Sequence, residues 1–234
     1  MTDKELREVL IDGCRELVRR GLSYGTSGNI SLRRDERHFF VSPTGIPYEA
    51  IQSGDIPLVD DGGRWFGRRR PSSEWRFHRD IYRARDEVAA IVHTHSPKAT
   101  SLACTGRGIP AFHYMVAIAG GSDIRCAPYY PYGTQELSDA AVAALAARRA
   151  CLLANHGVIA VGADLPAALA VAGEVENLAA QYCTALSIGE VRILDEIEMH
   201  RVVEKFRYYG KQDATDSDLV FGGADIPSAI VEEN

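Results

Sequence analysis

The run Val88-Ala89-Ala90-Ile91-Val92-His93-Thr94-His95 passes from small and apolar residues to a pair of histidines. Its apolar part predicts a buried strand over residues 88–93 that ends at a functional edge. Because side chains alternate between the two faces of a strand, His93 and His95 point the same way, about 7 Å apart along the strand. Two imidazoles placed in this way can ligate one metal ion.

Two further segments carry residue types that bind metals. Glu74 directly follows Ser72 and Ser73, and His156 follows the apolar run 151–154 and Asn155. Three histidines and one carboxylate form a ligand set that suits zinc. The remaining histidines are interpreted as ordinary core or surface residues: His38, His78, His113 and His200.

His78 offers an alternative partner for Glu74. The i,i+4 spacing of the two residues puts them on one face of a helix, and a Glu-x-x-x-His metal pair is chemically reasonable. This alternative gives no role to the two serines that precede Glu74. We therefore rank it below the set of three histidines and Glu74.

Three short polar segments have the composition of anion-binding turns. They are Gly28-Asn29, Thr44-Gly45 and Ser72-Ser73, and the third pair is expected at the start of a helix. Backbone N–H groups and hydroxyls in such turns can hold a phosphate without a large basic pocket. Taken singly, each segment is as well explained by an ordinary turn or cap. A phosphate held at Ser73 would lie near Glu74, which suggests chemistry on a phosphorylated small molecule.

Hydrophobic periodicity and capping signals predict alternating helices and short strands. Expected strands cover residues 30–32, 38–41, 88–93, 124–127, 151–154 and 158–161. Expected helices begin near residue 2, at residue 72 or 73, and near residues 97, 134, 164 and 198, and end near residues 21, 85, 102, 148, 186 and 209. No linker or repeat interrupts the pattern, which indicates one α/β domain over residues 1–210 and a polar, acidic tail over residues 211–234.

Composition argues against several classes of function. The 234 residues carry a net charge of −6, which favours neither a nucleic-acid groove nor an anionic membrane surface. No apolar run approaches the length of a bilayer span, and the start of the chain does not resemble a signal peptide. The five scattered cysteines are typical of reduced packing residues, so we expect a cytoplasmic protein. The basic run Arg68-Arg69-Arg70 is interpreted as a solvated hairpin face without a function of its own.

The ordered motifs of the chain resemble the class II aldolase/adducin family between about Glu5 and Gly210. The segments that carry the resemblance are residues 25–29, 43–49, 71–78, 109–115, 126–129, 133–138 and 204–206. The resemblance implies one α/β domain with three layers, in which helices flank a mostly antiparallel central sheet. It also implies a metal-dependent aldolase that reversibly cleaves L-fuculose-1-phosphate, or a similar ketose-1-phosphate, to dihydroxyacetone phosphate and an aldehyde such as lactaldehyde.

The resemblance also implies roles for particular residues. One Zn²⁺ per subunit would be held by His93, His95, His156 and Glu74, and Glu74 would also be the catalytic base. The substrate phosphate would be bound by Gly28, Asn29, Thr44, Gly45, Ser72 and Ser73. Tyr114 would reach the aldehyde end from a neighbouring subunit of a C4 homotetramer with active sites at its interfaces. Tyr209 would help to close the site.

Other members of the family mark the alternatives. The pentulose-phosphate 4-epimerases have Asp at the position of Glu74, and adducin-like scaffold members lack the metal ligands that this chain retains. Tyr132 and Asn155 replace residues that are Phe and His in the fuculose-phosphate enzymes. Tyr132 borders the aldehyde side, so the aldehyde is the least determined part of the substrate. An aldolase for 5-deoxyribulose-1-phosphate or 5-methylthioribulose-1-phosphate would share all of these features.

Overall fold

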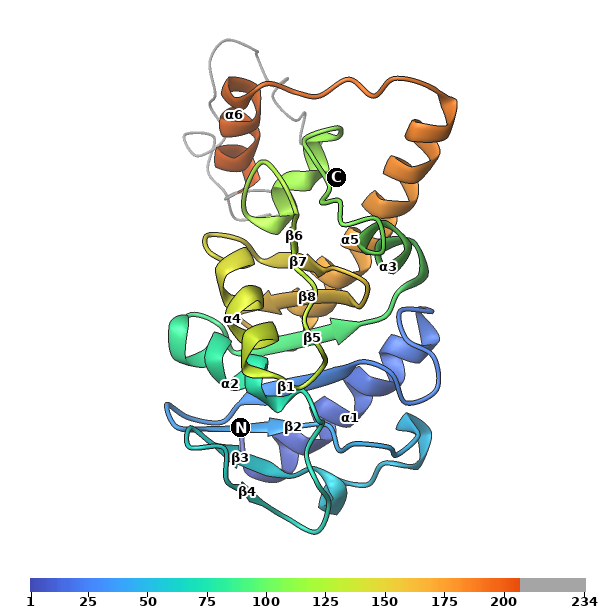
Figure 1. The fold of residues 1–234 in the computed structure, drawn as a ribbon. Helices are drawn as coiled ribbons and strands as arrows, with labels where there is room; N and C mark the ends of the chain where they lie inside the picture. The colour runs from blue at the N-terminus through green and yellow to red at the C-terminus, as the bar shows by residue number, and fades with distance from the viewer. Residues whose placement is uncertain (207–234) are drawn as a thin grey trace, which may run out of the picture.

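The computed structural model describes residues 1–206, which form one mixed sheet of eight strands flanked by helices (Figure 1). The strands are Asn29–Arg33 (β1), His38–Val41 (β2), Leu58–Asp60 (β3), Trp65–Phe66 (β4), Ala90–Thr94 (β5), Arg125–Ala127 (β6), Ala150–Leu153 (β7) and Gly157–Gly162 (β8). Their order across the sheet is β4-β3-β2-β1-β5-β8-β7-β6. Neighbouring strands are antiparallel except β6 and β7, which are parallel. The predicted α/β class with a mostly antiparallel central sheet is confirmed.

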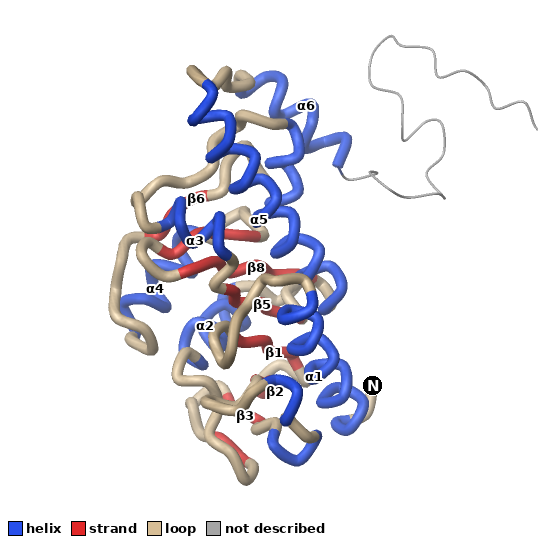
Figure 2. Tube along the Cα trace, turned by 90° about the vertical axis from the view of Figure 1, so that its right-hand side faces the viewer, coloured by secondary structure: helices blue, strands red, loops and turns tan. Residues whose placement is uncertain are grey.

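Helices cover both faces of the sheet and give the expected three layers (Figure 2). They are Asp3–Arg19 (α1), Trp75–Ala84 (α2), Pro97–Ala103 (α3), Gln135–Ala144 (α4), Leu165–Ile188 (α5) and Glu196–Phe206 (α6), with 3-10 turns at Tyr48–Ala50 (η1), Ser53–Asp55 (η2) and Tyr114–Ala119 (η3). Helices α2 and α4 pack on one face, and α1, α3 and α5 pack on the other. Helix α6 packs against η3 beyond the sheet.

Strand β5 lies near the middle of the sheet and is buried along its whole length. Ala90 and Val92 enter the core beneath α1, α3 and α5, whereas Ile91 enters the core beneath α2 and α4. His93 shares the face of Ile91, because strand side chains alternate. The ring of Phe77, from α2, meets His93 edge-on with 5.4 Å between ring centroids. The alternation of β5 therefore directs His93 toward helix α2.

The segment before the basic run contains two strands that were not among those predicted. β3 and β4 form a hairpin at the edge of the sheet. The Nε atoms of Arg68 and Arg69 each lie 3.0 Å from Oδ1 of Asp55, which is only 4% exposed. The basic run therefore follows the hairpin instead of lying on its face as expected, and two of its arginines pair with the buried carboxylate of Asp55.

Several element boundaries differ from the sequence-based predictions. The N-cap of α2 is Glu74, so neither Ser72 nor Ser73 is the cap, and Ser72 Oγ instead accepts the N–H of Glu74 at 3.2 Å. Helix α6 begins at Glu196 rather than at residue 198. Its predicted end, Tyr209 and the tail 211–234 lie outside the described residues. Among the described helices, none is both long and apolar enough to cross a membrane.

Candidate functional site

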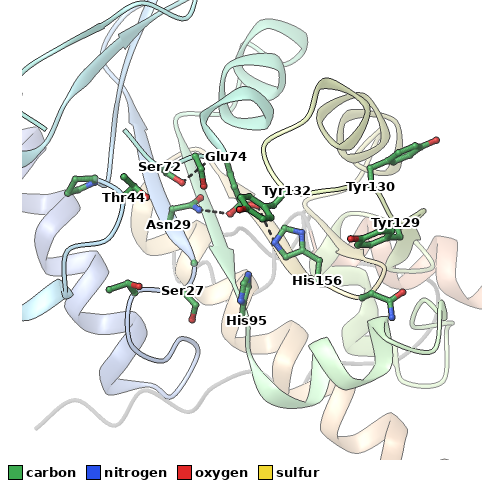
Figure 3. A pocket seen from close by; sticks show the side chains of 15 residues that line it. Ser27, Asn29, Thr44, Ser72, Glu74, His95, Tyr129, Tyr130, Tyr132 and His156 are labelled. Atoms are coloured by element: carbon green, nitrogen blue, oxygen red, sulfur yellow. Dashed lines mark hydrogen bonds and ion pairs between the residues drawn. The ribbon is translucent and has the colours of Figure 1, made fainter. Parts of the chain in front are cut away.

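Most of the expected site residues line a cavity of about 310 Å³ at the ends of the inner strands of the sheet (Figure 3). The start of β1, the region following the end of β5, the turn between β7 and β8, and the start of α2 all open onto it. The lining residues are Thr26, Ser27, Gly28, Asn29, Pro43, Thr44, Ser72, Ser73, Glu74, His95, Tyr129, Tyr130, Tyr132, Asn155 and His156. Segments far apart in the sequence therefore contribute to one pocket.

Three histidines converge at this pocket. His93 lies near the end of β5, and His95 directly follows that strand. His156 lies in the turn between β7 and β8. One ring nitrogen of each lies within 4.8 Å of the others. His93 Nδ1 lies 2.8 Å from the carbonyl oxygen of Val158, which can only accept a hydrogen bond, so Nδ1 donates and the neutral ring carries its lone pair on Nε2. This Nε2 lies 3.0 Å from Nε2 of His95.

The Glu74 carboxylate completes the cluster. Its Oε2 lies 3.3 Å from His93 Nε2, and its Oε1 lies 3.1 Å from His156 Nε2. Oε1 is buried without an aligned hydrogen-bond donor. Burial raises the pKa of this carboxyl, but the neighbouring His93 and His156 outweigh burial and hold the pKa well below its ordinary value. Nitrogen lone pairs and an under-bonded carboxylate oxygen around one point fit a divalent metal ion.

Gly157 explains how two strands bring the histidines so close together. A Cβ atom at this position would lie 2.3 Å from the carbonyl oxygen of Thr94 and 2.9 Å from Cδ2 of His95. His156 precedes Gly157 in a tight turn, where Asn155 has a positive φ of 55°. Only a residue without a side chain lets this turn approach the end of β5.

The predicted anion-binding turns also reach the pocket, with one exception. Gly28 has a φ of +79°, and a Cβ atom there would lie 2.6 Å from the carbonyl oxygen of His93. The backbone N–H of Thr44 donates to Arg70, so Thr44 can offer its hydroxyl but not its N–H. Ser72 and Ser73 line the cavity beside Glu74, whereas Gly45 does not line it. The structure thus brings together five of the six residues expected to bind phosphate.

The structure does not bring His78 into the histidine group, which among the described residues comprises His93, His95 and His156. The ring of His78 is fully buried, and this burial lowers the pKa of His78 to about 3. His78 Nε2 lies 2.5 Å from Oδ1 of Asn29. Asn29 Nδ2 in turn donates to Glu74 Oε2 at 2.9 Å. His78 therefore contacts the site through Asn29.

Aromatic residues form a wall of the pocket that the sequence-based site list lacked. Tyr129, Tyr130 and Tyr132 follow β6 and line the cavity (Figure 3). A polar or aromatic run directly after a strand, as at His95, was the signal that could have identified them. Tyr114 lies elsewhere: it is 47% exposed and lines a separate apolar groove of about 590 Å³ between η3 and α6.

Comparisons with known proteins identify relatives along most of the chain. The sequence model described as the Class II Aldolase and Adducin N-terminal domain matches residues 8–183. A 5-methylthioribulose-1-phosphate/5-deoxyribulose-1-phosphate aldolase of Rhodospirillum rubrum is 52% identical over 205 residues, which cover 88% of this chain and 92% of that protein. An L-fuculose phosphate aldolase of Escherichia coli strain K12 is 44% identical over 90% of this chain and 98% of its own length. A solved structure of an L-fuculose 1-phosphate aldolase matches with a TM-score of 0.84 and 41% identity, covering 87% of this chain and 96% of that one.

Proposed function

Because the chain belongs to the class II aldolase and adducin family, we propose that it is a metal-dependent aldolase that cleaves a ketose-1-phosphate to dihydroxyacetone phosphate and an aldehyde. One observation carries the proposal. Two histidines of the cluster, His95 and His156, and Glu74 share a single cavity with Gly28, Thr44 and the two serines before Glu74. A metal site beside an anion site suits a substrate that carries a carbonyl and a phosphate.

The proposed metal is zinc, one ion per subunit, held by His93, His95, His156 and Glu74. When bound, the ion supplies Lewis-acid stabilisation of the negative charge that develops as the C3–C4 bond of the substrate breaks. The chain itself holds the metal-ligating side chains in the required orientation. The carbonyl of Val158 holds the His93 ring so that its Nε2 lone pair faces the cluster.

Glu74 is the proposed catalytic base. In the direction of condensation it would remove a proton from C3 of dihydroxyacetone phosphate, and in cleavage it would return that proton. A carboxylate in its charged form can accept this proton, as a base requires. The N–H of Glu74 is bound by Ser72, which keeps the backbone of the base fixed beside the anion-binding turn.

The substrate phosphate is proposed to lie against Gly28, Asn29, Thr44, Ser72 and Ser73. The close packing of Gly28 on the β5 backbone brings this turn beside the histidines. The hydroxyls of Thr44, Ser72 and Ser73 can donate to phosphate oxygens without a positive charge nearby. Gly45 remains a prediction from the resemblance, at a φ of +69° in the adjacent turn.

As candidate substrates, we rank 5-deoxyribulose-1-phosphate and 5-methylthioribulose-1-phosphate above L-fuculose-1-phosphate. This ranking reverses the order expected from the sequence. The relative named for the first pair is 52% identical, against 44% for an L-fuculose phosphate aldolase. Tyr129, Tyr130 and Tyr132 also give the open side of the cavity an aromatic wall, which suits an aldehyde with an apolar end.

A C4 homotetramer is part of the proposal. Tyr114 does not line the pocket of its own chain, and it lies half-exposed in a groove with Phe112 and Leu194. A neighbouring copy packed on this groove could receive the phenol in its own site. We also propose a cytoplasmic location, because a reducing compartment suits five free cysteines.

The proposal is tested with the purified chain and a panel of the three ketose-1-phosphates, scored by kcat/KM for formation of dihydroxyacetone phosphate. We expect cleavage of all three, with the two 5-deoxypentulose phosphates preferred. Chelation should abolish the activity, and added Zn²⁺ or Co²⁺ should restore it, with about one metal per chain. Full activity without metal, or interconversion of pentulose-5-phosphates without cleavage, would overturn the proposal.

A further inference from the structure

A chain of buried hydrogen bonds leads from Glu74 into the core between β1 and α2. Asn29 Nδ2 lies 2.9 Å from Glu74 Oε2, and Asn29 Oδ1 lies 2.5 Å from His78 Nε2. His78 Nδ1 lies 2.7 Å from Ser31 Oγ, and Ser31 Oγ lies 2.8 Å from the hydroxyl of Tyr82. The function proposed above uses the first two members of this chain but assigns nothing to His78, Ser31 or Tyr82.

One arrangement of hydrogens satisfies every contact in the chain. The ionised carboxylate of Glu74 only accepts, so Asn29 must direct its NH₂ group toward it and its carbonyl oxygen toward His78. His78 therefore carries its proton on Nε2, and its bare Nδ1 accepts the hydroxyl proton of Ser31. The Ser31 oxygen is then left to accept from Tyr82. The orientation of the Asn29 amide and the tautomer of His78 thus determine one another.

Among residues 1–206, Asn29 and Ser31 are the hydrogen-bond partners of the His78 ring. Ser31 and His78 are both 0% exposed, and Tyr82 is 5% exposed. The rings of Phe77 and Phe39 lie next to the imidazole, with centroids at 4.6 Å and 6.5 Å. Water cannot replace a lost donor in such apolar surroundings without a new cavity. The loss of one hydrogen-bonding group in this series should therefore disturb the position of the Asn29 amide.

We propose that His78 is a positioning residue whose Nε2–H holds the Asn29 amide with its nitrogen toward the pocket, and that Ser31, backed by Tyr82, satisfies the other ring nitrogen of His78. The effect of this positioning on substrate binding rests on the proposed function. The Asn29 NH₂ group has two hydrogens: one binds Glu74, and the other can meet the substrate in the pocket that Asn29 lines. A flipped amide would present its oxygen to two anions, the base and the substrate phosphate.

Two substitutions of similar polarity separate positioning from mere packing. The amide of His78→Gln reaches the place of Nε2 and can still donate to Asn29, whereas the amide of His78→Asn reaches only the place of Nδ1. We expect kcat/KM to fall about 10-fold in His78→Asn, as for one lost hydrogen bond, and to stay within about 3-fold in His78→Gln. The absorption spectrum of bound Co²⁺ should be unchanged in both. Equal losses in the two variants would overturn the proposal.

A double-mutant cycle tests whether His78 acts through Asn29. In the Asn29→Ala background, His78→Asn should lower kcat/KM no further, because the amide that it positions is gone. His38→Asn is the matched control: His38 bonds Asp35 outside the pocket, and its loss should leave kcat/KM unchanged. Additive losses from Asn29→Ala and His78→Asn would show a general structural role and refute positioning.

The tautomer itself can be measured without any activity. The ¹⁵N spectrum of labelled imidazole distinguishes a protonated ring nitrogen from a bare one, and we expect the His78 proton on Nε2 in the wild-type chain. Ser31→Ala should leave the proton on Nε2, because the carbonyl oxygen of Asn29 still accepts it. If the chain showed no aldolase activity, the proposed function would fail while this result still stood. A wild-type proton on Nδ1 would refute the positioning role, whatever the activity.

Discussion

At Gly157 a single hydrogen atom in place of a side chain permits the histidine cluster to form. The Cβ of an alanine there would overlap the Thr94 carbonyl at 2.3 Å, and backbone atoms cannot move aside without separating β5 from β8. We expect Gly157→Ala to lose at least 10-fold in metal affinity, the scale of a disturbed ligand environment. Metal titration followed by absorption of bound Co²⁺ measures this loss.

The control for Gly157 is a glycine with open space around it. Gly173 stands inside α5, where a Cβ atom would meet nothing closer than 3.9 Å. Gly173→Ala should keep the metal and raise the free energy of unfolding by about 0.5–1 kcal/mol, because alanine favours a helix. Normal metal affinity in Gly157→Ala would contradict the close approach of the turn to β5.

Glu74 combines two roles that a single substitution can separate. The amide of Glu74→Gln can still coordinate weakly and can still pair with Asn29 after a rotation, but it cannot accept a proton at neutral pH. We expect retained metal and a fall in kcat of about 10²-fold, the usual scale for general acid–base catalysis. Exchange of the C3 proton of dihydroxyacetone phosphate with solvent is the direct measurement. Exchange near the wild-type rate would exclude Glu74 as the base, and Glu87→Gln on the surface is the control.

At the scale of elements, the register between β1 and β5 assembles the site. Asn29 is paired with His93 across the two strands, so the anion-binding turn before β1 lies beside the metal cluster after β5. A shift of one residue would turn Ser31 and Asn29 to the opposite face of the sheet. The same shift would move Ile30 out of the core beneath α1, α3 and α5 and put polar side chains in its place. Burial of the apolar residues therefore favours the register that assembles the site.

Ion pairs around Asp55 connect η2 to the segment that follows the edge hairpin. Asp55 accepts from Arg68, Arg69 and the backbone N–H of Gln52. We expect Asp55→Asn to lower the free energy of unfolding at pH 7 by about 1–2 kcal/mol, as for lost hydrogen bonds to a charged group. Urea denaturation measures the change. Asp61→Asn, at an exposed pair with Arg37, is the control.

The same pairs predict how the effect changes with pH. Burial raises the pKa of Asp55, but the bonds from Arg69, Gln52 and Arg68 outweigh burial and hold the pKa below its ordinary value of 3.8. The stabilisation is therefore complete above the unfolded pKa and is lost as the pH falls through the lower folded value. The difference between wild type and Asp55→Asn should shrink below about pH 4. A difference that grew in acid would contradict this sign.

At the scale of the whole molecule, the position of Tyr114 predicts that the proposed site needs a second copy of the chain. Tyr114→Phe removes only a hydroxyl, so tetramer and metal should be kept while cleavage slows. Mixing Glu74→Gln with Tyr114→Phe subunits should create some sites that carry both native residues. Activity should then exceed that of either parent after subunit exchange. No rise, with exchange verified by mass, would place Tyr114 outside the neighbouring site.

The sequence by itself determined the parts that depend on local order. Alternation in residues 88–95 is sufficient to bury Val92 and to put His93 and His95 on one face, and capping residues located most helices. The sequence also identified Glu74 at the start of a helix and His156 after strand 151–154 as candidate metal ligands. His156 was recognisable because it closely follows an apolar run. The resemblance to the class II aldolases added roles to these residues and is borne out at the level of the family.

Only the tertiary structure decided which partner each polar group takes. Sequence spacing placed His78 beside Glu74 on one helix, yet the packing of α2 on the sheet directs His78 to Asn29 and Ser31. Likewise, the packing of the chain places the Tyr129–Tyr132 run at the cavity and Tyr114 in a separate groove. Periodicity fixes the face on which a side chain lies, but its partner is a residue distant in sequence, and long-range packing alone brings the two together.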